Sequence, residues 1–223
     1  MRAVACGPYR DRMRGAIHAL KYDRMQPAAR RLGAMLAPAI AMLADETPAG
    51  MLVVPVPLHR SRQAQRGFNQ AQELAVHALS ALRRTHPAWR LTLAPNALIR
   101  LRPTPIQAGL TARQRRINVR GAFRVPEAAA VFGRDILLID DVLTTGATAR
   151  AASQALLRAG AASVRVATLA RAARAFPILR GSDVLFDDFQ SNANPQPHGA
   201  NDSAPAATLF QNRILSSHDQ PSF

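Results

Sequence analysis

One segment in the second half of the chain constrains the fold more than any other. Residues 136–139 are four consecutive aliphatic side chains, and two acids, Asp140 and Asp141, follow them directly. A short loop rich in threonine comes next, and a helical pattern then runs over 149–159. An apolar run of this length that ends in a turn predicts a buried strand. Such a strand delivers two carboxylates to its carboxyl end, just before the turn into a helix.

The turn itself predicts an anion site. Unpaired amide groups at a helix N-terminus and the helix dipole both favour negative charge, and hydroxyl groups add donors beside them. The loop that we assign to a bound phosphate consists of Thr144, Thr145, Gly146, Ala147 and Thr148. Neighbouring carboxylates suit sugar hydroxyls, so the pattern indicates a sugar phosphate. The alternative is structural, since an acid at a strand end is often only a helix cap, but burying two unpaired carboxylates is costly.

Strands and helices alternate along the remainder of residues 51–175. Residues 51–56 read as a second buried strand, 57–68 as a polar, basic loop, and Asn69 as the N-cap of the helix that follows. Further strands are predicted at 98–101, 121–125 and 164–169. This alternation indicates an α/β fold with a parallel sheet and right-handed crossovers. Ligands of such sheets bind beyond the carboxyl ends of the strands, where 57–68 and 140–148 both lie.

The two ends of the chain differ in composition from this core. Residues 1–50 are predicted to form a helical N-terminal segment, since apolar side chains recur there at helical spacing. Residues 176–223 are rich in Ser, Asn, Pro, Gln and Ala, and we expect a disordered tail. Without a long apolar run or a signal-peptide pattern, a cytoplasmic protein with no membrane span is expected. The single cysteine, Cys6, fits a reducing compartment.

The chain is strongly basic, with 29 Lys and Arg against 14 Asp and Glu and a net charge of +15. The excess lies before residue 177, and every basic side chain except Lys21 is arginine. Such a surface attracts polyphosphates and nucleic acids alike. Aromatic residues, on which bases stack, make up only 5% of the chain. The charge is therefore compatible with nucleic-acid contact and with a merely solvated basic surface.

Several distinctive segments occur together with the 136–148 run. They are Ala19-Leu20-Lys21-Tyr22, the sequence PVPLHR at 55–60, RGFNQ at 66–70 and the stretch 107–123. As a set they resemble the ComF family, the competence-protein relatives of the type I phosphoribosyltransferases. The resemblance covers residues 9–171, and it implies a phosphoribosyltransferase-like, Rossmann-like core.

The resemblance implies that the chain binds phosphoribosyl pyrophosphate (PRPP), or a related sugar phosphate, together with Mg²⁺. Asp140 and Asp141 then hold the ribose hydroxyls and support the metal indirectly, and the loop 144–148 holds the 5′-phosphate. Candidates for the pyrophosphate loop are His59, Arg60 and Arg66. A mobile lid is implied over 102–118. Its motif-like positions are Gln107, Arg115 and Asn118.

Two features depart from the family pattern. Members commonly begin with a cysteine-rich zinc ribbon, whereas one cysteine cannot supply four thiolates, so no zinc is expected in this chain. Purine-salvage relatives carry an additional acid at the position of Thr144, where it serves the base, and a threonine cannot take that role. The second departure weakens an assignment to purine salvage, and the first leaves the native start of the protein open.

Three functions compete on this basis. In the first, the protein is a Mg²⁺-dependent phosphoribosyltransferase with an unknown acceptor, in which lid closure excludes water from an oxocarbenium-like ribose. In the second, it is a non-catalytic competence protein that contacts single-stranded DNA or a helicase during DNA uptake. In the third, it is a regulator that senses PRPP without turnover. Each of them is compatible with a homodimer.

Overall fold

A computed structural model describes residues 2–22, 26–43, 50–104 and 111–172. Within these ranges five strands form one sheet in the order β1-β7-β6-β2-β3, and every neighbouring pair is parallel. The strands are β1 (Arg2–Pro8), β2 (Gly50–Pro55), β3 (Arg90–Leu93), β6 (Asp135–Leu143) and β7 (Ser163–Arg171). The predicted α/β fold with a parallel sheet is confirmed.

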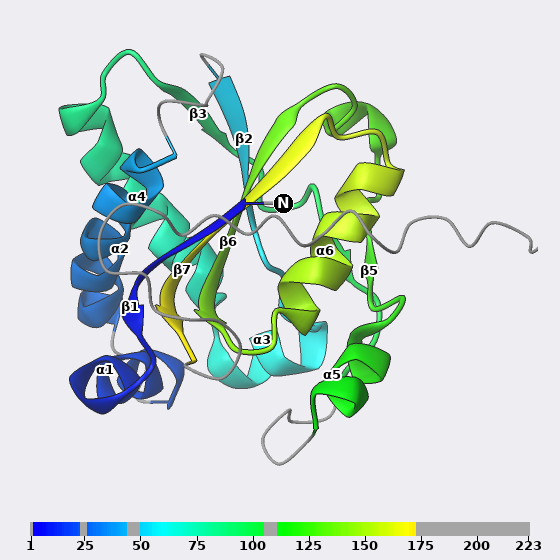
Figure 1. Cartoon of the computed structure of the whole chain (residues 1–223), viewed down its shortest axis with the longest axis horizontal. Helices are drawn as coiled ribbons and strands as arrows, with labels where there is room; N and C mark the ends of the chain where they lie inside the picture. The colour runs from blue at the N-terminus through cyan, green and yellow to red at the C-terminus, as the bar shows by residue number, and fades with distance from the viewer. Residues whose placement is uncertain (1, 23–25, 44–49, 105–110, 173–223) are drawn as a thin grey trace, which may run out of the picture. The chain divides into compact units, whose positions relative to one another are not determined.

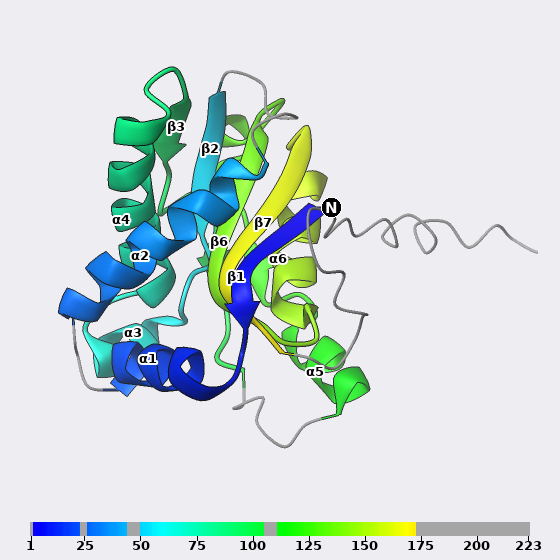
Figure 2. The same ribbon diagram turned by 60° about the vertical axis from the view of Figure 1, so that its left-hand side comes forward.

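Helices cover both faces of this sheet (Figures 1 and 2). One face packs against α1 (Asp11–Tyr22), α2 (Gln26–Ala41) and α4 (Gln70–Thr85). The other face packs against α6 (Ala147–Arg158). Two short helices, α3 (Arg60–Arg66) and α5 (Ala112–Val119), lie near the carboxyl ends of the strands. Among the described helices, none combines the length and the apolar character that crossing a bilayer requires.

The central strand β6 explains why both faces are covered. Leu137 and Ile139 pack into the core on the α2 and α4 side, whereas Ile136 and Leu138 pack into the core on the α6 side, and all four are fully buried. Successive side chains of a strand point to opposite faces. An uninterrupted aliphatic run is therefore what a strand buried on both faces requires, and the prediction made from this run is confirmed.

A separate pair of short strands lies beside α6. These strands are β4 (Ile99–Arg100) and β5 (Phe123–Arg124), and they pair antiparallel. They confirm the strands predicted at 98–101 and 121–125, and Phe123 anchors them in the core on the α6 side. The pair does not extend the main sheet, so it brings its own side chains to the site from a different direction.

The predicted lid region contains a helix at its C-terminal end. Thr111 caps α5 through a capping box, in which its side chain accepts a hydrogen bond from the Gln114 backbone N–H and Gln114 Oε1 accepts one from the Thr111 N–H. Gln107 lies outside the described residues, as does the predicted tail at 176–223.

The N-terminal segment is only partly as predicted. Helices α1 and α2 confirm its helical character, but β1 was not predicted and neither was β3. Strand β1 pairs in parallel with β7 from Arg2↔Arg165 to Pro8↔Arg171. An edge strand needs few buried side chains, and only Ala3 and Val4 of β1 are buried. The apolar pattern of such a strand is too short to stand out in the sequence.

The structure also corrects the polar loop predicted at 57–68, because α3 occupies most of that stretch. His59 begins the helix, since its Nδ1 accepts a hydrogen bond from the Ser61 backbone N–H (3.3 Å), and Gly67 ends it with a left-handed φ of 82°. No residue of α3 is buried. Apolar periodicity is the main sequence signal of a helix, and a helix without an apolar stripe does not show it.

Helices α2 and α4 cross very closely at Gly33. A Cβ atom added there would lie 2.5 Å from His77 Cβ and 2.9 Å from the Leu74 carbonyl oxygen. A side chain at this position would push the helices apart or distort them. We therefore expect Gly33→Ala to lower the free energy of unfolding by about 1–3 kcal/mol, as measured by urea denaturation.

Gly15 in α1 provides the matched control, because nothing lies within 4 Å of a Cβ added there. Gly15→Ala removes a glycine from a helix interior and is expected to raise the free energy of unfolding by up to about 1 kcal/mol. Similar effects of the two substitutions would contradict the close crossing at Gly33.

Candidate active site

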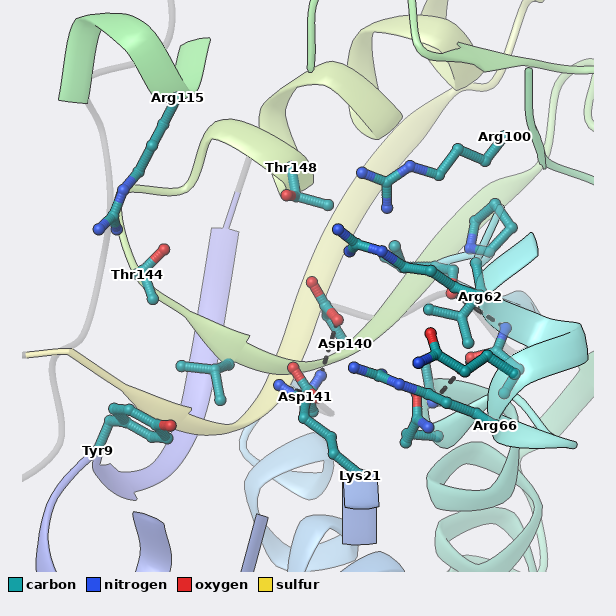
Figure 3. Close-up of a pocket in the computed structure, with 18 residues that line it drawn as sticks. Tyr9, Lys21, Arg62, Arg66, Arg100, Arg115, Asp140, Asp141, Thr144 and Thr148 are labelled. Carbon is teal, nitrogen blue, oxygen red and sulfur yellow. Dashed lines mark hydrogen bonds and ion pairs between the residues drawn. The ribbon is translucent and has the colours of Figure 1, made fainter. Parts of the chain in front are cut away.

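A cavity of about 630 Å³ lies beyond the carboxyl ends of β2 and β6 (Figure 3). This is the edge of the sheet at which the sequence analysis places the ligand. The wall of the cavity combines segments that are far apart in the chain: the end of β1, α1, the region from β2 to α4, β4, α5, and the turn from β6 into α6. Its cationic side chains are Lys21, Arg62, Arg66, Arg100 and Arg115.

Two adjacent carboxylates stand at the end of β6. The Asp141 backbone N–H donates a hydrogen bond to Asp140 Oδ1 (2.9 Å), and Lys21 Nζ forms an ion pair with Asp141 Oδ2 (2.6 Å). The side chains of Lys21 and Asp141 are only 24% and 13% exposed. Helix α1 is held in place by Ile17 and Leu20, which are fully buried. One of the two carboxylates therefore has a shielded counter-ion from the N-terminal helix.

The surroundings shift the pKa values of Asp140 and Lys21. Burial and the neighbouring charge of Asp141 raise the pKa of Asp140 to about 7, in spite of the hydrogen bond from the Asp141 N–H and the charges of Lys21 and Arg100. Burial would lower the pKa of Lys21, but the charge of Asp141 and the hydrogen bond to it prevail, so that pKa lies above its ordinary value. Asp140 is thus close to its titration midpoint at neutral pH, and a cation or hydrogen-bond donor from a ligand would favour its ionised form.

Three arginine side chains reach toward the acids from the opposite wall (Figure 3). Arg62 and Arg66 come from α3, and Arg100 comes from β4. Burial and the nearby charge of Arg62 lower the pKa of Arg100. The planar guanidinium group meets phosphate oxygens in a bidentate geometry. A group of partly buried guanidinium groups that repel one another indicates a site for an anion.

The turn into α6 forms the other side of the cavity. Gly146 begins the helix with φ 71° and ψ 6°, a left-handed conformation that favours glycine. No side chain caps this N-terminus within the described part of the chain. Thr144 and Thr148 line the cavity at this turn, and Arg115 extends from α5 toward Thr144 (Figure 3). These groups together are suited to a phosphate.

The side chains of the predicted phosphate loop divide into two groups. Thr144 and Thr148 reach the cavity, whereas Thr145 and Gly146 form the turn itself and Ala147 is the first residue of α6. Ala147 is buried, and Thr145 Oγ1 is buried without a hydrogen-bond partner among the described residues. Any contact from these three residues to a phosphate would come mainly from their backbone N–H groups.

The predicted pyrophosphate-loop residues are not brought together. His59 is only 9% exposed and caps α3, with its Nδ1 also 2.8 Å from Ser61 Oγ. Arg60 is exposed and does not line the cavity, whereas Arg66 does. Residues four apart on a helix share one face. The helical form of α3 therefore turns Arg62 and Arg66 toward the cavity and Arg60 away from it.

The described lid residues also differ in their placement. Arg115 is partly buried and lines the cavity, whereas Asn118 lies on α5 outside the cavity lining. Of the positions that the family resemblance implied for the lid, Arg115 is thus the one that the described residues place at the site.

A model of the phosphoribosyl transferase domain matches residues 103–194 of this chain. The DNA utilization protein YhgH of Escherichia coli O157:H7 is 37% identical over 174 residues, which cover 76% of this chain and 72% of that protein. Competence protein F of Haemophilus influenzae is 37% identical over 121 residues, covering 54% of this chain and 50% of that protein. Competence protein ComFC of Bacillus subtilis is 37% identical over 123 residues, covering 54% and 44%. The chain belongs to the ComF family.

Membership of the ComF family confirms the resemblance seen in the sequence, but several cavity residues were not predicted. Lys21 was not predicted to be a site residue, although it is the sole lysine of an arginine-rich chain and lies in one of the ComF-like segments. Arg62 and Arg100 lie outside the quoted segments, and Gln70 ends the RGFNQ segment without having been assigned a role. They reach the site through the phase of α3, the start of α4 and the placement of β4.

The raised pKa of Asp140 predicts a pH-dependent stability. An acid whose pKa rises from 3.8 to about 7 on folding stabilises the protein below pH 4, and this contribution is lost as the pH increases through 7. Asparagine does not titrate. Without Mg²⁺, we therefore expect the free energy of unfolding of Asp140→Asn to exceed that of the wild type by on the order of 2 kcal/mol at pH 8. This difference should shrink toward pH 4.

Urea unfolding at several pH values in the presence of a chelator measures this difference. Asp11→Asn is the control, because the Asp11 side chain is 84% exposed, and it should follow the wild type at every pH. An advantage of Asp140→Asn that grew toward acid pH would contradict the account.

Proposed function

We propose that this ComF-family protein binds PRPP, or a closely related sugar phosphate, with Mg²⁺ in the cavity at the carboxyl edge of the sheet. The observation that carries the proposal is the position of Asp140 and Asp141 between two anion-binding groups. The turn into α6 lies on one side with Thr144 and Thr148, and the arginines of α3 and β4 lie on the other (Figure 3). A ribose with a phosphate at one end and a pyrophosphate at the other matches this order of charges.

The acid pair fits Mg²⁺ as part of a complex with the ligand. Mg²⁺ prefers oxygen ligands, and it is usually bound by one or two carboxylates together with substrate phosphates. Among the described residues, no three His, Cys, Asp or Glu side chains lie together in a way that would hold a metal ion. Phosphate oxygens would therefore have to complete the coordination. When bound, the ion would neutralise negative charge on the leaving pyrophosphate.

In a transfer reaction, different side chains of the cavity would have different roles. Asp140 and Asp141 accept hydrogen bonds from the ribose hydroxyls and so orient the ring. Thr144, Thr148 and the amide groups of the turn hold the 5′-phosphate. The arginines of α3 neutralise the pyrophosphate as it leaves, and electrostatic stabilisation that grows as the bond breaks is what accelerates such a step. The acceptor would then attack the ribose from the open part of the cavity.

Calorimetry with PRPP and Mg²⁺ tests this proposal. We expect the wild type to bind and the double variant Asp140→Asn/Asp141→Asn to bind on the order of 100-fold more weakly, since two charge-assisted hydrogen bonds are lost. Asp11→Asn removes an exposed carboxylate and should bind as the wild type does. Equal binding by the wild type and the double variant would contradict the role given to the acids.

A pyrophosphate-release assay separates a transferase from a sensor. Wild-type protein is incubated with PRPP, Mg²⁺ and each of a set of purine and pyrimidine bases. Release that requires one of the bases identifies a transferase and its class of acceptor. PRPP binding without release in any of these mixtures would favour a regulatory or binding role.

A role in DNA uptake is the second candidate. It is supported by the names of three relatives, of which one is a DNA utilization protein and two are competence proteins. The net charge of +15 also supports it. Contact with single-stranded DNA would then be largely electrostatic. We expect an affinity for a labelled oligonucleotide, measured by fluorescence anisotropy, that falls at least tenfold between about 50 and 200 mM salt.

The matched variant for this measurement is Asp140→Asn/Asp141→Asn. Removing two negative charges should leave DNA affinity unchanged or slightly increased, in contrast to its effect on PRPP. Absence of DNA binding at low salt would leave a protein partner, such as a helicase, as the remaining form of this candidate.

A further inference from the structure

One buried threonine joins two of the cavity arginines. Thr104 is only 3% exposed and lies behind the cavity wall rather than in it. Its carbonyl oxygen accepts a hydrogen bond from Arg62 Nη2 (2.8 Å), and its hydroxyl oxygen accepts one from Arg100 Nη2. Guanidinium groups from α3 and β4 are thus tied to a single residue.

Holding these two groups together is unfavourable in itself. Their charges repel, and Arg102 adds to the repulsion felt by Arg100. Arg100 Cζ lies over the Phe123 ring, 5.3 Å from the ring centroid, and this contact helps to keep the guanidinium group in place. Among the described residues, no carboxylate lies within ion-pair distance of Arg62 or Arg100. The charge of Asp140 reaches Arg100 only from beyond ion-pair distance. Like charges that are collected without an ion-paired carboxylate indicate an anionic ligand.

Gln70 gives an independent indication at the same place. It is only 2% exposed and lines the cavity. Its Oε1 accepts a hydrogen bond from Arg66 Nη1 (2.9 Å), which directs its Nε2 away from Arg66. Gln70 Nε2 and Arg100 Nε are both buried without a hydrogen-bond partner among the described residues. A buried donor without a partner is unfavourable, and an acceptor on a ligand would supply the missing hydrogen bond.

We propose that Thr104 is a positioning residue that holds Arg62 and Arg100 in place to bind a diphosphate group. Arg66 and Gln70 complete this anion site. Each guanidinium group can engage a pair of phosphate oxygens. Three such groups therefore suit a diphosphate better than a single phosphate. The inference rests on the proposed function, in which the diphosphate is the leaving group of PRPP. Of the predicted pyrophosphate-loop candidates it keeps Arg66, and it replaces His59 and Arg60 with Arg62, Arg100 and the residue behind them.

Calorimetry with inorganic pyrophosphate on the full chain tests the role of Thr104. Thr104→Val removes the hydroxyl acceptor and keeps the side-chain volume, so Arg100 loses its anchor. We expect pyrophosphate to bind about tenfold more weakly to this variant. Thr104→Ser keeps the hydroxyl and should restore the wild-type affinity. Ribose 5-phosphate, whose phosphate would bind at the turn into α6, should bind equally to all three proteins.

Two results would overturn the inference. One is an unchanged pyrophosphate affinity in Thr104→Val. The other is a loss that extends equally to ribose 5-phosphate or to Thr104→Ser, because a merely structural residue would produce it. If Thr104→Val does not fold, Arg100→Met takes its place, and the same selective loss of pyrophosphate affinity is expected.

The same measurements separate this inference from the proposed function. Wild-type protein that binds pyrophosphate but not PRPP would remove the proposed function and leave the anion site standing. Wild-type protein that binds PRPP but shows no selective effect of Thr104→Val would remove the role of Thr104 alone.

Discussion

The charge of two adjacent carboxylates at the end of a buried strand is the constraint on which this site depends. Asp140 and Asp141 follow a segment that is covered on both faces, and even partly buried carboxylates need partners. Lys21 supplies one at 2.6 Å from Asp141, so α1 has to lie beside this edge of the sheet. Strand β1 leads into α1 and fixes where it starts. The remaining cations of the cavity exceed what the two acids can balance, and that excess is what an anionic ligand would neutralise.

The sequence predicted those elements whose buried residues form a clear apolar pattern within one contiguous segment. Residues 136–139 are apolar throughout because both faces of β6 are covered. Strand β1 buries only two side chains and β3 buries none, so edge strands of this kind leave a weak pattern. Helix α3 has no buried side chain at all. It is specified by its ends, where His59 caps it and Gly67 stops it, and these signals are weaker than apolar periodicity.

The same distinction applies to the site. The acids and the turn into α6 are contiguous in the sequence, and they were found from local spacing. Lys21, Arg100 and Thr104 come from α1, from β4 and from the chain beyond it, and only the folded arrangement of these elements brings them to the site. Whether Arg60 or Arg62 faces the cavity depends on the helical phase of α3. A segment predicted to be a loop has no such phase. The family resemblance pointed to segments that line the cavity, but the side chains that face the cavity followed from the three-dimensional arrangement.

The most direct test of the account is a crystal structure of the protein with PRPP and Mg²⁺ bound. The account predicts the ribose hydroxyls within hydrogen-bond distance of Asp140 and Asp141, the 5′-phosphate at the turn into α6, and the pyrophosphate against Arg62, Arg66 and Arg100. A ligand bound in the reverse direction, or outside this cavity, would contradict it.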